Sequence, residues 1–432
     1  MTRTGLLSAT ILGAALALSA PAAAQDKPES LKIGITTFLT GPASVFGVPA
    51  RDAAEMLIEQ INADGGIGGV PVEASFIDEG AGGEALTTEY RRQVEDEGAD
   101  VMLAAISSGN CTQLAPLAED LQVINLMWDC GTQRIFEEGD YTYVFRTQAN
   151  ATPEMLASVL YLLRQKPDFQ TIAVVNQDYA WGRDSWDIFS TALKALKPDV
   201  EIVGEFFPAF GAPDYSTEIS RLSAMRPDVI LSTSWGGDLD TFVQQAAQRG
   251  LMNQSTFVLP LAESSLERLG TALPDAVIVG ARGDHYFQHP EMVGQEGFDS
   301  FVADFRDRTG AYPIYSVFHM AQALSALEAA YETAIEQNGV EWPTEEQVIA
   351  TLEGMEFQGF GRPVTIRADH QGVEAQLLGT TTTDNDLGFA SLTDIAIYDG
   401  GPLTTPVGEN SIEWIEALDP SFVDQVTPTT FD

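Results

Sequence analysis

The chain has 432 residues, and 63 acidic against 22 basic side chains give it a formal net charge of −41 at pH 7. This acidity argues against binding to nucleic acid or anionic lipid, which both need clusters of Lys and Arg, and is typical of a highly soluble surface. The apolar content of 44% indicates a globular protein, and the length is enough for two domains with separate cores.

The first 24 residues have the pattern of a cleaved export signal. A basic residue, Arg3, precedes an uncharged apolar run over 5–20 and an Ala-x-Ala sequence that ends at Ala24. These three features in this order are typical of secretory signals, and the run is shorter than the ~20 residues of a membrane-spanning helix. We therefore predict cleavage after Ala24, export to the periplasm and no insertion of the mature chain into the membrane.

Strand and helix patterns alternate from residue 31 onward. The predicted strands are 31–35, 72–76, 100–106 and 122–128, and the predicted helices between them are 50–61, 84–97 and 111–120. The strand at 100–106 is almost continuously apolar, as are strands of parallel sheets that helices cover on both faces. This part of the chain is expected to form one doubly wound lobe.

The same alternation starts again after residue 150. It predicts strands at 171–176, 201–206, 228–232, 256–259 and 275–280, with helices at 155–164, 185–196, 217–225 and 239–249. Helices at 298–308 and 316–338 have no strands of their own and are expected to return to the first lobe.

The predicted fold class is therefore α/β, with two doubly wound Rossmann-like lobes between which the chain crosses. Lobe 1 is predicted over 25–146 and 282–352. Lobe 2 is predicted over 147–281 and 353–432, where a strand-rich tail pads it.

The two cysteines, Cys111 and Cys130, each follow a predicted strand. An oxidising compartment favours their pairing, so we expect a disulfide, with two buried thiols as the alternative.

Motifs for catalysis are missing from the sequence. There is no Gly-x-Gly-x-x-Gly after a strand, no Walker A motif and no Gly-x-Ser-x-Gly. His285 and His289 are spaced like metal ligands, but Pro290 predicts a loop there and not a helix. Residues 384–388 faintly resemble a calcium-binding loop, but the glycine at the sixth position of such a loop and the glutamate at its twelfth are missing, which favours a polar turn. We expect no enzymatic activity, no cofactor and no metal.

Polar residues gather where two predicted strands of the first lobe end. Ser107, Ser108 and Asn110 open the helix after the strand at 100–106. Hydroxyls and free amides at a helix start suit a ligand carboxylate, although plain helix caps use the same residue types. The segment 128–132 ends the next strand.

Aromatic residues mark the matching edge of the second lobe. Trp181 follows the strand at 171–176, and Trp235 follows the strand at 228–232. Ligands of doubly wound folds bind outside the carboxyl ends of the strands, so the cleft between the lobes is the predicted binding site.

Several segments also resemble a known family. The sequences LKIGI at 31–35, TGP at 40–42 and INADGGIGG at 61–69 are similar to those of type I periplasmic solute-binding proteins, in particular the Leu/Ile/Val-binding proteins of ABC importers. The resemblance extends over about residues 30–400. It implies two lobes joined by a hinge of three crossings, closure around a small solute, and delivery to an ABC permease in the inner membrane. We also expect a monomer.

The resemblance implies roles for individual residues. Ser108 matches a carboxylate-binding serine, and the segment 129–132 matches the next contact region. Trp181 and Trp235 match aromatic residues on the two sides of the second lobe's cleft, and Phe46 matches an aromatic contact of the first. The predicted ligand contacts are Phe46, Ser107, Ser108, Asn110, Asp129, Gly131, Thr132, Trp181, Trp235, Glu263 and Tyr286.

One position departs from the family pattern. In the family, an acidic residue pairs with the ammonium of a bound amino acid. In this chain that position falls near Leu261, and Glu263 follows two places on. An ammonium buried without its counter-charge is costly. Our hypothesis is therefore a small carboxylate with an aromatic or apolar body between Trp181 and Trp235. The alternatives are an amino acid or cationic solute, with Asp129 or Glu263 beside its ammonium, and a sensor that a separate receptor reads.

Overall fold

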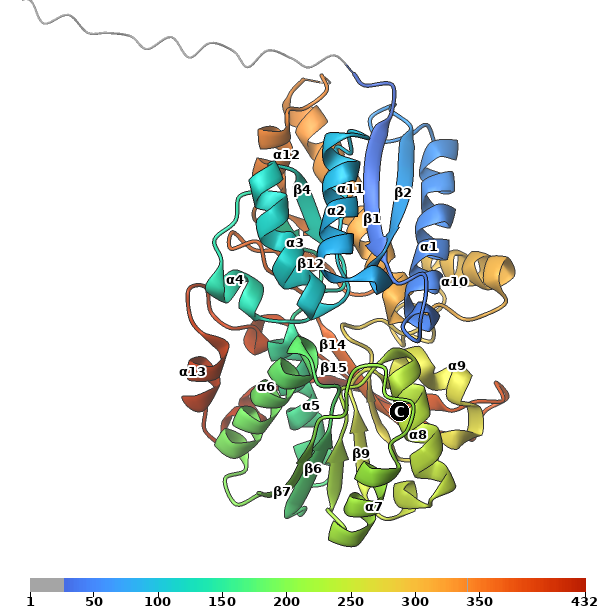
Figure 1. Ribbon diagram of the computed structural model, residues 1–432, viewed down its shortest axis with the longest axis vertical. Coiled ribbons are helices and arrows are strands. Elements are labelled where there is room, and N and C mark those ends of the chain that lie inside the picture. The colour runs from blue at the N-terminus through green and yellow to red at the C-terminus, as the bar shows by residue number, and fades with distance from the viewer. Residues whose placement is uncertain (1–26, 340) are drawn as a thin grey trace, which may run out of the picture.

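The first sheet lies in the upper half of the molecule (Figure 1). The computed structural model describes residues 27–339 and 341–432, so the predicted export signal over 1–24 lies outside the described residues. The strands of this sheet are β1 (Leu31–Thr37), β2 (Val72–Asp78), β3 (Val101–Leu103), β4 (Ile124–Met127) and β5 (Val144–Arg146). The helices that connect them are α1 (Ser44–Ala63), α2 (Gly83–Glu95), α3 (Ser108–Leu121) and α4 (Arg134–Glu138).

The second sheet forms the lower half. Its parallel strands are β6 (Thr171–Val175), β7 (Glu201–Phe206), β8 (Val229–Leu231), β9 (Thr256–Leu259) and β10 (Ile278–Gly280). The helices among them are α5 (Ala151–Gln165), α6 (Ala180–Leu196), α7 (Ser216–Met225), α8 (Gly236–Gln248) and α9 (Leu266–Leu269). Three antiparallel strands extend it beyond β10: β14 (Gln376–Thr382), β15 (Ser391–Tyr398) and β16 (Thr429–Phe431).

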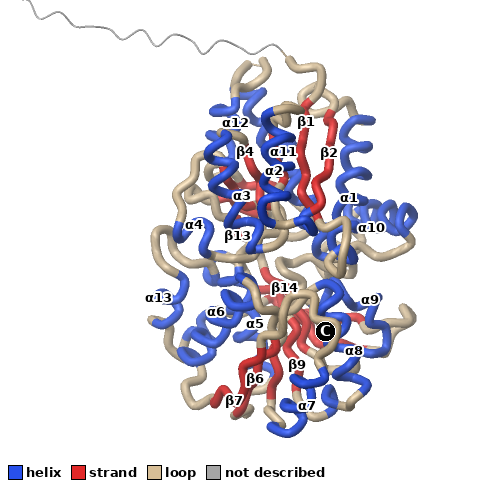
Figure 2. The backbone as a smooth tube through the Cα atoms, in the orientation of Figure 1, coloured by secondary structure: helices blue, strands red, loops and turns tan. Residues whose placement is uncertain are grey.

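Both sheets repeat one strand order. The first runs β2-β1-β3-β4-β5, and the parallel part of the second runs β7-β6-β8-β9-β10. Figure 2 shows helices on the outside of the strands in each half. Strands β3 and β8 are apolar and buried along their whole length, and β4 is buried throughout with Asn125 as its one polar residue, which explains their nearly continuous apolar pattern. The predicted α/β fold of two doubly wound lobes is confirmed.

The chain passes between the lobes three times. It leaves the first sheet after β5 and returns after β10, since α10 (Glu296–Thr309) and α11 (Tyr315–Gln337) pack against α1. Next come α12 (Glu345–Leu352) and a small sheet of β11 (Glu356–Phe357), β12 (Val364–Ile366) and β13 (Gly372–Val373). After β15, α13 (Ser411–Glu416) and α14 (Phe422–Gln425) precede β16.

We propose that the third crossing lies later in the chain than the change of lobe predicted after Leu352. The N–H of Arg146 in β5 donates to the carbonyl of His370 (2.9 Å), and the ring of His370 hydrogen-bonds with the carbonyl of Val144 (2.9 Å). Residues up to 370 therefore lie beside the first sheet, and we propose that the crossing is near Gly372. In the part of the chain that the structure describes, no helix combines the length and apolarity needed to cross a membrane.

The disulfide between Cys111 and Cys130 is present. It ties the first turn of α3 to the loop after β4, so it joins the two segments that carry Ser108 and Gly131.

Replacing both cysteines by alanine is expected to lower the free energy of unfolding by about 3 kcal/mol, because a closed loop of 19 residues restricts the unfolded chain. Urea denaturation of the oxidised proteins measures the difference. A thiol reductant should lower the midpoint of the wild type and leave that of C111A/C130A unchanged; equal midpoints for the two oxidised proteins would contradict the expectation.

Candidate functional site

A small cavity lies between the lobes, at the carboxyl ends of their strands. Its free volume is about 10 Å³, room for about one water molecule. The residues that line it are Ile106, Ser108, Asp129, Gly131, Tyr179, Trp181, Trp235, Leu261, Arg282 and Tyr315. All of them except Tyr315 follow the carboxyl end of a strand, and both sheets contribute, as expected where two doubly wound lobes face each other.

The lobes touch on both sides of this cavity. On one side the N–H of Gly237 donates to the carbonyl of Pro42 (3.1 Å). On the other, the hydroxyl of Thr132 donates to Asp184 (2.6 Å). Gly131 lies so close to the opposite lobe that a Cβ there would be 2.4 Å from the ring of Trp181. Only glycine permits this approach, and the structure is therefore a closed arrangement of the two lobes.

The first lobe supplies a polar edge. The hydroxyl of Ser108, at the start of α3, accepts the N–H of Thr132 (3.2 Å) and keeps its own proton for another acceptor. Asn110 turns away from the cavity, because its side-chain amide donates to the buried carboxylate of Glu79 (3.0 Å). The backbone N–H of Ser107 donates to the same carboxylate (3.3 Å), and Ser107 does not line the cavity. The carboxylate of Glu79 thus already accepts some of the hydrogen-bond donors at the start of α3.

The second lobe supplies aromatic walls. The indole N–H of Trp181 donates to the carbonyl of Thr233 (2.9 Å), and that of Trp235 donates to the hydroxyl of Tyr179 (2.5 Å). These bonds fix both rings and leave their apolar surfaces for a ligand. Phe46 supports them from the first lobe, with its ring centroid 5.3 Å from that of Trp235.

Arg282 brings a positive charge to the cavity wall. Its guanidinium donates to Asp129 (2.7 Å) and to Glu154 (3.1 Å), and all three side chains are buried. It also lies over the ring of Trp181, 4.9 Å from the centroid. Burial raises the pKa of both carboxyl groups to about 7, against the attraction of Arg282. Burial lowers the pKa of Arg282, but the two carboxylates outweigh this and raise it, so Arg282 stays charged.

Five of the predicted contacts line the cavity: Ser108, Asp129, Gly131, Trp181 and Trp235. The other six predicted contacts do not line the cavity: Phe46, Ser107, Asn110, Thr132, Glu263 and Tyr286. Glu263 turns back to accept the N–H of Tyr315 (2.8 Å). Tyr286 lies in the core of the second lobe, where its hydroxyl accepts the N–H of Leu392 (3.0 Å).

Four further residues line the cavity that were not predicted as contacts from the sequence: Ile106, Tyr179, Arg282 and Tyr315. Tyr179 and Arg282 carried a usable signal, because each follows a predicted strand of the second lobe. Tyr315 had none of this kind, since it begins α11 and reaches the cavity only because α11 packs on α1.

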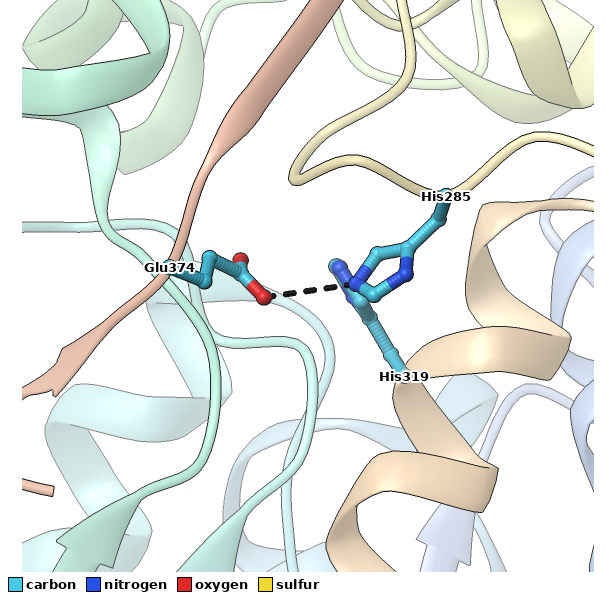
Figure 3. A group of neighbouring side chains, drawn as sticks. All are labelled: His285, His319 and Glu374. Atoms are coloured by element: carbon cyan, nitrogen blue, oxygen red, sulfur yellow. Dashed lines mark ion pairs between the residues drawn. The ribbon is translucent and has the colours of Figure 1, made fainter. Parts of the chain in front are cut away.

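Behind Asp129, His285, His319 and Glu374 meet at the hinge (Figure 3). One potential ligand atom from each lies within 4.8 Å of the others, and all three residues are buried. The ring of His319 is already engaged at both nitrogens, by Asp129 (2.6 Å) and by the carbonyl of Arg282 (2.7 Å). A metal would have to break one of these bonds, so we interpret the cluster as a buried structural group of the hinge, in which His285 lies 3.3 Å from the carboxylate of Glu374.

Glu263 is expected to make stability depend on pH. Burial raises its pKa to about 8, whereas an unfolded chain exposes the carboxyl with its ordinary pKa near 4.5. The folded protein therefore holds a proton that the unfolded chain releases, and the free energy of unfolding falls as the pH rises from about 5 to 8, by at most about 1.4 kcal/mol per pH unit for each such group. Urea denaturation at several pH values measures this slope.

E263Q should reduce the slope, since glutamine carries no proton to lose. E267Q, at an exposed position in the following turn, serves as the control and should keep the wild-type slope. A stability that rises with pH over this range would contradict the expectation.

Comparison with known proteins gives a consistent result. Residues 30–385 match the family described as periplasmic binding protein. A Leu/Ile/Val-binding protein homolog of Brucella melitensis is 26% identical over 397 residues, which cover 88% of this chain and 95% of the relative.

Two solved structures share the fold. One is a solute-binding protein of an ABC transporter from Rhodopseudomonas palustris BisB5, in complex with 3,4-dihydroxybenzoic acid; its TM-score is 0.76 at 19% identity, covering 88% of this chain and 99% of that one. The other is a leucine-, isoleucine-, valine-, threonine- and alanine-binding protein from Brucella ovis in a closed conformation, with a TM-score of 0.73 at 18% identity, covering 88% and 98%.

Proposed function

We propose that this chain, which belongs to the periplasmic binding protein family, captures a small organic carboxylate between its lobes. It acts in the periplasm as a monomer and delivers the solute to an ABC permease. The role is binding and release, without catalysis. The R. palustris relative with a bound dihydroxybenzoic acid supports a ligand of this class.

The observation that carries the proposal is the composition of the cavity wall. Ser108 has a hydroxyl proton to donate, and Arg282 contributes a guanidinium with five N–H donors, not all of which its two carboxylate partners use. Both suit a carboxylate. Trp181, Trp235 and Leu261 surround the remaining space with apolar surface. The free volume of about 10 Å³ is far below the roughly 300–1,000 Å³ of sites for drug-sized ligands, so the lobes have to move apart to admit a ligand.

An amino acid is the second candidate. The Leu/Ile/Val-binding relatives support it, and Asp129 offers a negative charge in the cavity. Leu261 counts against it, because the cavity wall is apolar where the resemblance places the acidic partner of an ammonium.

A thermal-shift screen of the mature chain against aromatic and aliphatic carboxylates, amino acids and quaternary amines tests the proposal. A ligand at a thousand times its Kd adds about 4 kcal/mol, which moves the midpoint by several degrees. We expect hits among the carboxylates and, with a hit bound, a smaller radius of gyration in solution scattering as the lobes close. A screen in which only amines shift the midpoint would overturn the proposal.

Delivery to a permease, as opposed to signalling through a receptor, is tested in cells. Deleting the gene should abolish uptake of the labelled hit, and unimpaired uptake would favour the sensor.

A further inference from the structure

Asp129, in the cavity wall, has hydrogen-bond partners in the described chain at only one of its two carboxylate oxygens. One oxygen of Asp129, Oδ1, accepts Arg282 Nη1 (2.7 Å) and hydrogen-bonds with His319 Nδ1 (2.6 Å). The other, Oδ2, is buried and has no hydrogen-bond partner among the described residues. The buried hydroxyl of Tyr315, on the same cavity, likewise makes no hydrogen bond of good geometry within the described part of the chain.

Such groups are rare in folded proteins. Most buried polar side-chain atoms have a partner, and an exception calls for an explanation such as a ligand. An unpaired charged acceptor is especially costly, because it has lost water and gained nothing in return. Since Asp129 and Tyr315 both line the cavity, a molecule held there is in a position to supply the missing donor.

The other acidic side chains near the cavity do not share this property. Glu154 directs both oxygens to Arg282. Glu263 turns to the backbone of Tyr315 and does not line the cavity. Leu261 fills the place where the resemblance puts an acid. Asp129 is thus the acidic side chain of the cavity wall with a free acceptor, among the residues that the structure describes.

We propose that Asp129 selects ligands that carry a hydrogen-bond donor, a hydroxyl or an ammonium, in addition to their carboxylate. This rests on the proposed function, because the carboxylate places the ligand and Asp129 Oδ2 accepts from its second polar group. A ligand without that donor leaves Oδ2 buried and unpaired, and a site built to bind a polar group discriminates strongly against the analogue that lacks it.

Matched ligands test the proposal by isothermal titration calorimetry of the mature chain at pH 8, above the pKa of about 7 that burial gives Asp129. The aliphatic series is leucine, 2-hydroxy-4-methylpentanoate and 4-methylpentanoate. The aromatic series is 3- and 4-hydroxybenzoate, the corresponding fluorobenzoates and benzoate. In the series that binds, a donor-bearing member should bind at least ~30-fold more tightly than its donor-free partner. Comparing leucine with its hydroxy analogue identifies the donor as ammonium or hydroxyl.

Donor-free and donor-bearing partners that bind within threefold of each other would overturn the inference and leave the proposed function intact. No binding of any carboxylate would overturn both.

The variant D129N provides a readout that a merely structural role would not move. Arg282 can only donate, so the amide oxygen stays on its side and the amide NH₂ takes the place of Oδ2. A donor then faces the ligand's donor. For an ammonium, which cannot accept, the ratio of affinities within the matched pair should fall to near one or invert; a hydroxyl can still accept from the amide, so its ratio should fall by less. E154Q removes a negative charge from the same Arg282 but leaves Oδ2 in place, so it should keep the wild-type ratio. A ratio that D129N leaves unchanged would also overturn the inference.

Discussion

Replacing Arg282 by methionine is expected to lower the free energy of unfolding by about 3–5 kcal/mol. The guanidinium lies between the carboxylates of Asp129 and Glu154, all three buried, and removing one partner of a buried ion pair leaves uncompensated charge in a medium that solvates it poorly. The effect should be larger at pH 8 than at pH 6, because the pKa of about 7 of both carboxyl groups lets them take up protons at the lower pH. Urea denaturation at the two pH values measures it.

The control is R91M, which removes an arginine from an exposed pair with Glu95 in α2 (2.9 Å). Exposed pairs of this kind contribute about 0.3–0.5 kcal/mol, so its unfolding should resemble that of the wild type. The triple variant R282M/D129N/E154Q should recover part of the loss, since it no longer buries unpaired charge. An R282M protein as stable as R91M would contradict the account of this ion pair.

Replacing Trp181 by alanine is expected to weaken ligand binding by about 100-fold or more. Its ring is buried, faces Gly131 of the opposite lobe and lies beneath Arg282. Truncating such an aromatic anchor removes the contact between the lobes together with a wall of the cavity, and buried tryptophans at the centre of an interface contribute about 2–4 kcal/mol. Calorimetry with the tightest-binding carboxylate measures the change.

W186A is a matched control from the same helix. Trp186 in α6 is buried too, but its indole N–H donates to Glu205 (3.0 Å) and it does not line the cavity. Both variants should lose about 3–5 kcal/mol of stability, whereas only W181A should lose affinity. Equal affinities for the two variants would mean that the ligand binds elsewhere.

The sequence was informative about the site wherever a role follows from position along a strand. Ser108, Asp129 and Trp181 were predicted because each comes after a strand. In both lobes the cavity lies at the carboxyl ends of the strands, where ligands of doubly wound folds bind. The continuous apolar runs of the parallel strands made those strands easy to locate. The same reasoning placed the cleft between the lobes.

Side-chain direction and long-range packing were beyond such reasoning. Glu263 follows β9 as Leu261 does, but its carboxylate turns to the backbone of Tyr315. Tyr315 reaches the cavity through the docking of a helix from a distant part of the sequence. Strands β11, β12 and β13 have two or three residues each, too few to show any periodicity in the sequence.

A crystal structure of the mature chain with its tightest-binding carboxylate tests the central claim most directly. We predict ligand density in the interlobe cavity, with the carboxylate at Ser108 and Arg282 and the body between Trp181 and Trp235. Density instead in the larger cavity of about 540 Å³ beside α4 and α13, with only water between the lobes, would contradict it.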